Sequence, residues 1–91
     1  NVTLVIFSEF GRRVKENGSG TDHGTAGPMF IIGGNNKGKI IGNNPNLSQL
    51  DNGDLLYETD FRSVYATLLQ EKFKFDPTLI NIKNNPMSGL F

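Results

Sequence analysis

The segment of the sequence most suited to metal binding or acid–base catalysis is Thr21-Asp22-His23-Gly24-Thr25, which holds the only histidine of the chain. Asp22 and His23 are adjacent and flanked by small residues, so both side chains have room to reach one cation. Imidazole and carboxylate are good ligands for Zn²⁺ or Mn²⁺, and carboxylates also bind Ca²⁺. The imidazole could equally act as a general acid or base near neutral pH. Because one histidine and one aspartate do not complete a four-ligand site, a polar surface loop is the competing interpretation.

A second candidate segment, residues 8–13, follows the apolar run 2–7. In parallel α/β sheets, ligand sites form at the carboxyl ends of the strands. Glu9 would there be a metal ligand or a base, and Arg12 or Arg13 would hold an oxyacid anion with two parallel hydrogen bonds. The competing interpretation is a solvated loop with a weak Glu–Arg ion pair.

A third segment, Gly33 to Lys39, matches G-x-x-x-x-G-K, most of a phosphate-binding P-loop. The motif then needs Ser or Thr for Mg²⁺, and this chain has Ile40. The following residues 41–45, Ile-Gly-Asn-Asn-Pro, cannot build the helix whose N-terminus would cradle phosphate. We therefore interpret the segment as a Gly/Asn turn and keep a nucleotide-binding fragment as the weaker alternative.

The elements that position these segments begin with two apolar runs. Residues 2–7 are almost continuously apolar, which is typical of a parallel strand buried on both faces. Residues 28–32 form a second strand with proline at its first position. Between them we predict a short helical turn or loop over 8–15 and a turn over 17–20.

The second half of the sequence predicts one helix after a long loop. Asn and Gly dominate residues 35–54, where only Lys39–Ile41 suggests a short strand. Asp60 is a good N-cap for a helix over about 61–72. Apolar residues recur there at helical spacing and predict a packed face: Phe61, Val64, Tyr65, Leu68 and Leu69.

Composition excludes several classes of function. Nine Lys and Arg balance nine Asp and Glu in 91 residues, which argues against a nucleic-acid-binding arm and a polybasic membrane anchor. No stretch is apolar for long enough to predict a membrane span. The absence of cysteine removes disulfides, zinc–thiolate sites and thiol catalysis. The abrupt start on an apolar run suggests a piece of a larger protein.

Five stretches together resemble a known family: LVIFSEFGRR, GTDHGTAGPMFIIGG, KGKIIG, TDFRSVYATLL and the closing GLF. They are similar to the C-terminal end of an uncharacterised family of exported, sulfatase-like bacterial proteins. That family belongs to the alkaline-phosphatase superfamily and often carries a twin-arginine export signal. The resemblance covers nearly the whole chain. It implies that residues 1–91 are a single unit, the C-terminal portion of a larger sulfatase/phosphatase-like domain in the periplasm or at the cell surface.

The superfamily's metal ligands can be placed on this sequence in two ways. Its members end one strand with an Asp-His or Asp-Asn pair, and a later His before a Pro-containing strand binds the other metal. One alignment places Asp22-His23 on the strand-end pair. The other, which we prefer because it keeps the strand order, places Ser8–Gly11 there and makes His23 the later His. Glu9 then replaces the Asp, and Phe10 replaces the His or Asn, so one metal position is degraded.

The resemblance implies an α/β fold, the C-terminal fragment of a mainly parallel, alkaline-phosphatase-like sheet with a flanking helix. It implies that the parent protein is a metal-dependent hydrolase of phosphate or sulfate esters, and that this segment alone is not a complete enzyme. The partners would be a small anionic ester and the remainder of the parent chain. The nucleophile would lie outside the segment, since no residue here combines a nucleophile with an adjacent base.

The residues implied for this activity are His23, Asp22 and Glu9 as ligands of a divalent metal, and Arg12 and Arg13 as contacts for the substrate oxyanion. Zn²⁺ and Mn²⁺ are the favoured metals, with Ca²⁺ a further candidate. The alternative is a non-catalytic binding or assembly module with a degenerate metal site, and it is motivated by Phe10 at a ligand position.

Overall fold

The computed structural model describes residues 2–33 and 38–91. The chain forms two compact units. The first combines Asn1–Gly34 with Gly42–Glu58, and the second combines Asn35–Ile41 with Thr59–Phe91. None of the helices in the described part of the chain is long and apolar enough to cross a membrane.

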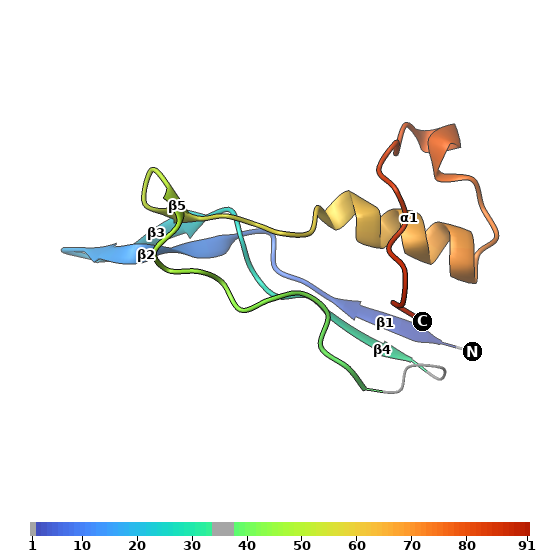
Figure 1. The fold of residues 1–91 in the computed structure, drawn as a ribbon, viewed down its shortest axis with the longest axis horizontal. Helices are drawn as coiled ribbons and strands as arrows, with labels where there is room; N and C mark the ends of the chain where they lie inside the picture. The colour runs from blue at the N-terminus through green and yellow to red at the C-terminus, as the bar shows by residue number, and fades with distance from the viewer. Residues whose placement is uncertain (1, 34–37) are drawn as a thin grey trace. The chain divides into compact units, whose positions relative to one another are not determined.

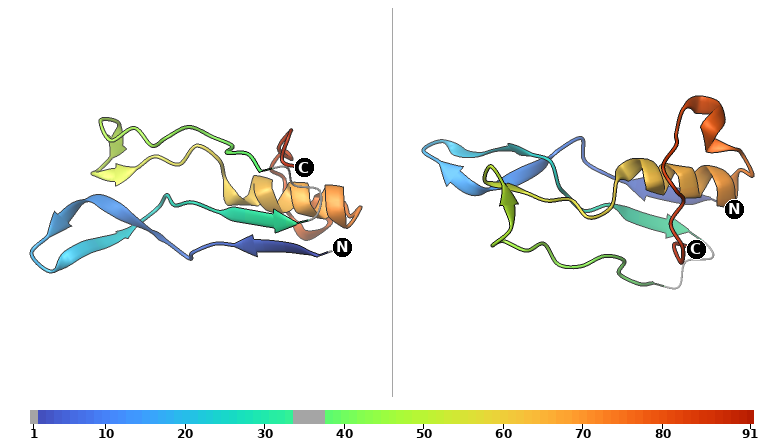
Figure 2. Two further views of the ribbon diagram at one scale, coloured as in Figure 1. Left: turned by 90° about the horizontal axis from the view of Figure 1, so that it is seen from below. Right: turned by 45° about the horizontal axis from the view of Figure 1, so that its top comes forward.

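The first unit is built from short antiparallel ribbons of two strands each (Figure 1). The pairs are β1 (Thr3–Ile6) with β4 (Phe30–Gly33), β2 (Gly11–Asn17) with β3 (Gly20–Gly24), and β5 (Leu50–Asp51) with β6 (Asp54–Leu55). Figure 2 shows from two further sides how β1 runs beside β4 and β2 beside β3. The chain therefore runs in one direction through β1 and β2, turns, and runs back through β3 and β4 beside them.

The predicted parallel, alkaline-phosphatase-like sheet is wrong, because no two of the described strands pair in parallel. A parallel pair needs a crossover of a dozen or more residues, usually a helix, between its strands. The chain between β1 and β4 instead forms β2 and β3, joined by a tight turn. The helical turn or loop predicted over residues 8–15 is wrong from Gly11 onward, where β2 begins, while residues 8–10 are irregular. The turn predicted over residues 17–20 is confirmed.

The β1–β4 ribbon shows why the apolar run over residues 2–7 did not identify a parallel strand buried on both faces. Along both strands, exposed and half-buried residues alternate, as in a ribbon with two different faces. The exposed face carries two cross-strand pairs, Leu4 with Ile32 and Ile6 with Phe30. Valine and isoleucine favour any strand, so a short apolar run does not fix the direction of its partner.

The β5–β6 ribbon lies where we predicted only loop. Its turn is Asn52-Gly53, with φ of 50° and 80°. Two consecutive positive φ values define the turn that suits a two-residue hairpin, and Asn-Gly is its strongest sequence signal. The strand predicted at Lys39–Ile41 is absent from the structure, where these residues are irregular.

The second unit contains the predicted helix, α1 (Phe61–Lys72), and its predicted N-cap is confirmed. One carboxylate oxygen of Asp60 accepts a hydrogen bond of 2.9 Å from the Arg62 backbone N–H, and the Arg62 side chain closes a 2.6 Å ion pair. Hydrogen bonds from the Arg62 side chain, and then from its backbone, lower the pKa of Asp60 to about 2.

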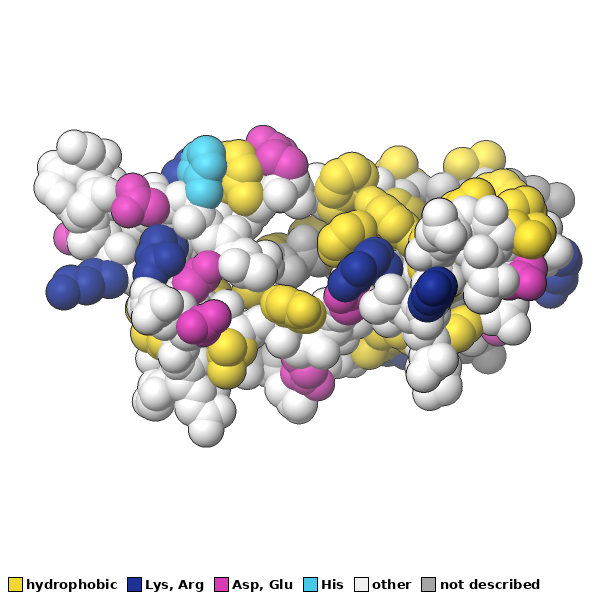
Figure 3. Space-filling model, turned by 90° about the horizontal axis from the view of Figure 1, so that it is seen from above, with side chains coloured by type: hydrophobic (Ala, Val, Ile, Leu, Met, Phe, Trp, Pro, Cys, Tyr) yellow, Lys and Arg dark blue, Asp and Glu magenta, His cyan; other side chains and the backbone are white. Residues whose placement is uncertain are grey.

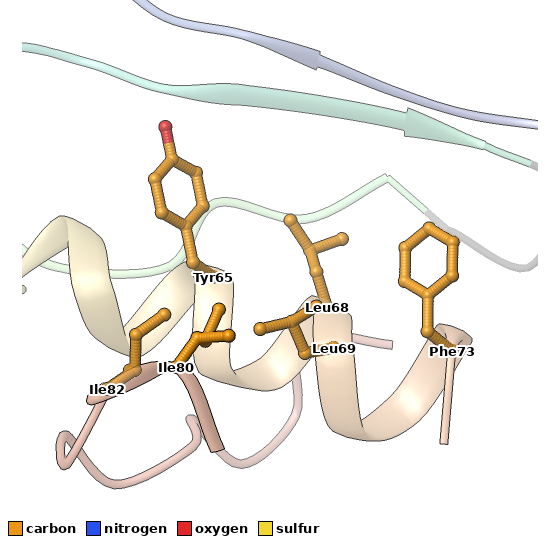
Figure 4. Close-up of a pocket in the computed structure, with 6 residues that line it drawn as sticks. All are labelled: Tyr65, Leu68, Leu69, Phe73, Ile80 and Ile82. Carbon is orange, nitrogen blue, oxygen red and sulfur yellow. The ribbon is translucent and has the colours of Figure 1, made fainter. Parts of the chain in front are cut away.

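One side of α1 borders an open apolar groove of about 300 Å³. It lies between α1 and the short 3₁₀ helix η1 (Pro77–Ile80), and Figure 4 shows its lining residues: Tyr65, Leu68, Leu69, Phe73, Ile80 and Ile82. The residues of the predicted apolar face therefore differ in burial. Val64 is buried, while Phe61 is 55% exposed.

The buried centre of the second unit lies on another side of α1, under the C-terminal tail. Ala66 and Thr67 have exposed fractions of 0% and 1%, and Leu90 from the tail is buried as well. The Thr67 hydroxyl donates to the Ser63 carbonyl oxygen at 2.7 Å and accepts from the Met87 backbone N–H at 2.8 Å. This buried hydroxyl therefore attaches the tail to the helix, together with a cation–π contact in which the Lys72 ammonium lies 4.3 Å from the centroid of the Phe91 ring.

We expect Thr67→Val to lower the free energy of unfolding by about 1–3 kcal/mol, because it leaves a part-buried N–H without its acceptor while keeping the side-chain volume. Urea unfolding of the intact protein measures the change. Thr67→Ser is the matched control, since it keeps the hydroxyl and removes only a methyl group. A valine variant no less stable than the serine variant would show that the hydroxyl does not hold the tail.

Candidate functional site

Phe10, Arg12 and His23 form one side-chain cluster, called here the Arg12–His23 cluster. Arg12 and His23 are direct cross-strand partners in the β2–β3 ribbon, so their side chains share a face. The Phe10 ring stacks on the imidazole, with 3.5 Å between centroids and 14° between planes. The guanidinium carbon of Arg12 lies 5.4 Å from the centroid of the same phenylalanine ring. Figure 3 shows the histidine, in cyan, at the surface.

The Arg12 guanidinium is held at two points. One of its terminal nitrogens donates to the Thr21 carbonyl oxygen at 2.8 Å, and the Phe10 ring provides a cation–π contact. A guanidinium has five N–H donors in a rigid fork, which suits the oxygens of a carboxylate, phosphate or sulfate. The arrangement therefore fixes the direction of a cation on an exposed face of the ribbon.

The His23 imidazole can still bind a metal ion or transfer a proton while it is stacked on Phe10. Stacking covers a face of the ring, whereas both ring nitrogens lie on its edge, so the Phe10 contact does not in itself prevent metal binding or proton transfer. The sequence comparison with the superfamily interprets Phe10 as a substitution that removes a metal ligand. In the structure the Phe10 ring contacts both His23 and Arg12, which the spacing of the sequence does not reveal.

The structure does not bring Asp22 and His23 to one point. They are neighbours in β3, and successive side chains of a strand face opposite sides. The Asp22 carboxylate accepts a 2.8 Å hydrogen bond from the Asn17 side-chain amide. Glu9 is exposed, just before Phe10. Among the described residues, no three histidine, aspartate or glutamate side chains lie close enough together to hold a metal ion.

Arg13, the other predicted anion contact, is directed to the β5–β6 turn. Its guanidinium donates to the Asn52 carbonyl oxygen. A Cβ atom on Gly53 would come within 3.0 Å of the same guanidinium, so the turn packs closely against it. Of the two arginines, Arg12 is therefore the one placed beside His23.

Asp54 in β6 is a polar residue that sequence reasoning missed. Its carboxylate accepts hydrogen bonds from the Thr25 hydroxyl at 2.7 Å and from the Thr25 backbone N–H at 3.0 Å. The hydroxyl bond is the main reason that the pKa of Asp54 is lowered, with smaller contributions from backbone N–H groups and from the charge of Arg13. The Asn-Gly dipeptide was the one sequence signal that could have placed this carboxylate in a hairpin.

The P-loop-like segment contributes no site that can be described. Residues 34–37 lie outside the described residues, and Gly33 ends β4. The chain over residues 38–49 contains no helix, which is the element that a phosphate-binding loop requires at its end.

Over residues 1–80, the sequence matches the family described as Protein of unknown function (DUF1501). This chain belongs to the DUF1501 family. The DUF1501 match extends from β1 to the end of η1, so it includes the Arg12–His23 cluster and Asp54, while the tail over 81–91 lies beyond it. No curated protein and no solved structure matches the chain significantly.

Proposed function

We propose that this segment supplies an anion contact and a metal ligand to a hydrolase of phosphate or sulfate esters. The observation that carries the proposal is the Arg12–His23 cluster, in which a guanidinium and an imidazole are held beside each other on a common phenylalanine ring. Both segments of the cluster, SEFGR and DHG, resemble exported sulfatase-like proteins, and this likeness supports the same class of ester and a location outside the cytoplasm.

Each residue has a distinct part in this function. Arg12 binds two oxygens of the ester anion and stabilises the charge that grows on them as the ester bond breaks. His23 supplies one imidazole ligand to a divalent metal. Since Asp22 faces the other side of β3, the carboxylate ligand beside His23 would be Glu9 or a residue of the parent protein outside this segment. The metal, when bound, acts as a Lewis acid. The nucleophile is assigned to no residue of this chain.

The test is to measure metal content and ester hydrolysis of the intact protein together. Bound Zn²⁺, Mn²⁺ and Ca²⁺ are counted by elemental mass spectrometry, and 4-nitrophenyl phosphate and sulfate distinguish the two ester classes. His23→Phe is the sharp variant, because a second phenyl ring can stack on Phe10 while no nitrogen remains to bind metal. We expect it to lose bound metal and turnover together.

Lys15→Ala is the matched control, since it removes an exposed cation from the same strand without touching the cluster. It should retain metal and turnover. If His23→Phe kept the metal content and turnover of the unmodified protein, His23 would not be a ligand and the hydrolase proposal would fail.

A non-catalytic binding module is the second candidate, and it is favoured by the way Phe10 lies flat on His23 and beneath Arg12. Such a platform can bind an anion without any reaction. This candidate predicts an intact protein that binds phosphate or sulfate through Arg12 but holds no stoichiometric metal and hydrolyses neither ester. Tight, stoichiometric Zn²⁺ or Mn²⁺ would contradict it.

A further inference from the structure

The β5–β6 ribbon contacts the β2–β3 ribbon immediately beyond His23. The Asp54 carboxylate accepts hydrogen bonds from both the hydroxyl and the backbone N–H of Thr25, two residues after His23. These bonds join residues that are far apart in the sequence, and their 2.7 Å and 3.0 Å lengths are those expected for donors to a carboxylate. The carboxylate therefore fixes the backbone at the end of β3.

Gly24, which lies between His23 and Thr25, makes this approach sterically feasible. A Cβ atom at residue 24 would lie 2.7 Å from a carboxylate oxygen of Asp54 and 2.7 Å from the carbonyl carbon of Arg12. Any other residue would push the carboxylate away from Thr25 or separate β2 from β3. The glycine thus serves both the Asp54 contact and the pairing of the two strands that carry the cluster.

The β5–β6 turn also contacts β2, the strand that pairs with β3. Arg13, the neighbour of Arg12, donates from its guanidinium to the Asn52 carbonyl oxygen. Residues 52–54 consequently contact β2 beside Arg12 and the chain just after His23.

The geometry points to Asp54 as a positioning residue for the Arg12–His23 cluster, acting through Thr25 to fix how the imidazole meets Phe10. This inference rests on the proposed function only for the claim that the cluster takes part in catalysis. The positioning itself is a property of this chain's own residues and is measurable without any reaction.

The test measures how fast diethyl pyrocarbonate modifies His23, by peptide mass spectrometry of the intact protein after a chelator has removed bound metal. The ring nitrogens stay on the exposed edge of the imidazole, but the reacting carbonyl carbon of diethyl pyrocarbonate carries bulky groups that extend above and below the ring plane. Phe10 on one face hinders their approach, so release of the stack should raise the rate. We expect Asp54→Leu, which removes both acceptor oxygens, to raise it several-fold. Asp54→Asn keeps one oxygen for Thr25 and should restore much of the shielding. Thr25→Val removes the hydroxyl bond but keeps the backbone N–H bond, so it should raise the rate less than Asp54→Leu does.

Asp51→Leu is the matched control, because Asp51 lies directly opposite Asp54 in the same ribbon. It should leave the rate unchanged. Equal His23 rates in Asp54→Leu and Asp51→Leu would overturn the positioning role, even if the protein hydrolyses esters. Faster modification in Asp54→Leu alone would establish it, even if the protein proves to hold no metal.

Discussion

Replacing Arg12 with alanine is expected to lower kcat for ester hydrolysis by about 10²–10³-fold, the usual loss on removal of one donor to a developing oxyanion. The expectation follows from the way the Arg12 guanidinium is held by the Thr21 carbonyl oxygen and the Phe10 ring. A cation that is already oriented in the ground state loses little conformational freedom when it binds the transition state. Steady-state kinetics of the intact protein measure the change.

Arg12→Lys separates charge from geometry in the same experiment. Lysine keeps the positive charge but lacks the planar fork, so we expect it to recover only part of the lost kcat. Lys15→Ala, on the same strand, should have unaltered kinetics. An Arg12→Ala variant with full kcat would show that the ester anion is bound elsewhere.

Gly11→Ala should have one of the largest effects on stability. A Cβ atom at residue 11 would overlap the carbonyl oxygen of Ala26 and come within 2.6 Å of its carbonyl carbon. Both are backbone atoms, so no side-chain rotation relieves the overlap. We expect a loss of about 1–3 kcal/mol in the free energy of unfolding, the usual cost of forcing extra atoms into a packed site.

Gly18→Ala is the matched control for this loss, because a Cβ atom there would meet nothing within 4 Å. Its effect should be small, and a slight gain in stability is expected where alanine fits the backbone. Urea unfolding of both variants gives the comparison. Equal stability of the two variants would mean that the chain near Ala26 moves aside at little cost.

Local signals in the sequence predicted the second unit better than the first. Asp60 and the periodic apolar residues after it specify α1 without reference to the rest of the chain. The burial of Ala66 and Thr67 escaped prediction because it depends on a tail that returns from residues 87–90. The direction of β1 also escaped, because pairing depends on how the chain returns and not on the residues of the strand itself.

The candidate site shows the same division. Residue type alone singled out Arg12 and His23, but their pairing comes from the register of β2 on β3. Sequence adjacency suggested that Asp22 and His23 act together, and the alternation of side chains in a strand separates them. The contact of Asp54 with Thr25 spans 29 positions in the sequence, and no local pattern encodes such a contact.

The bond between Thr67 and the Met87 backbone N–H also determines which substitutions the tail can tolerate. Since the helix recognises a main-chain donor, almost any side chain at position 87 preserves the link, and proline alone would abolish it. The tail beyond the DUF1501 match should therefore tolerate most substitutions at position 87, while the backbone amide, the buried Leu90 and the contact between Lys72 and Phe91 continue to hold it.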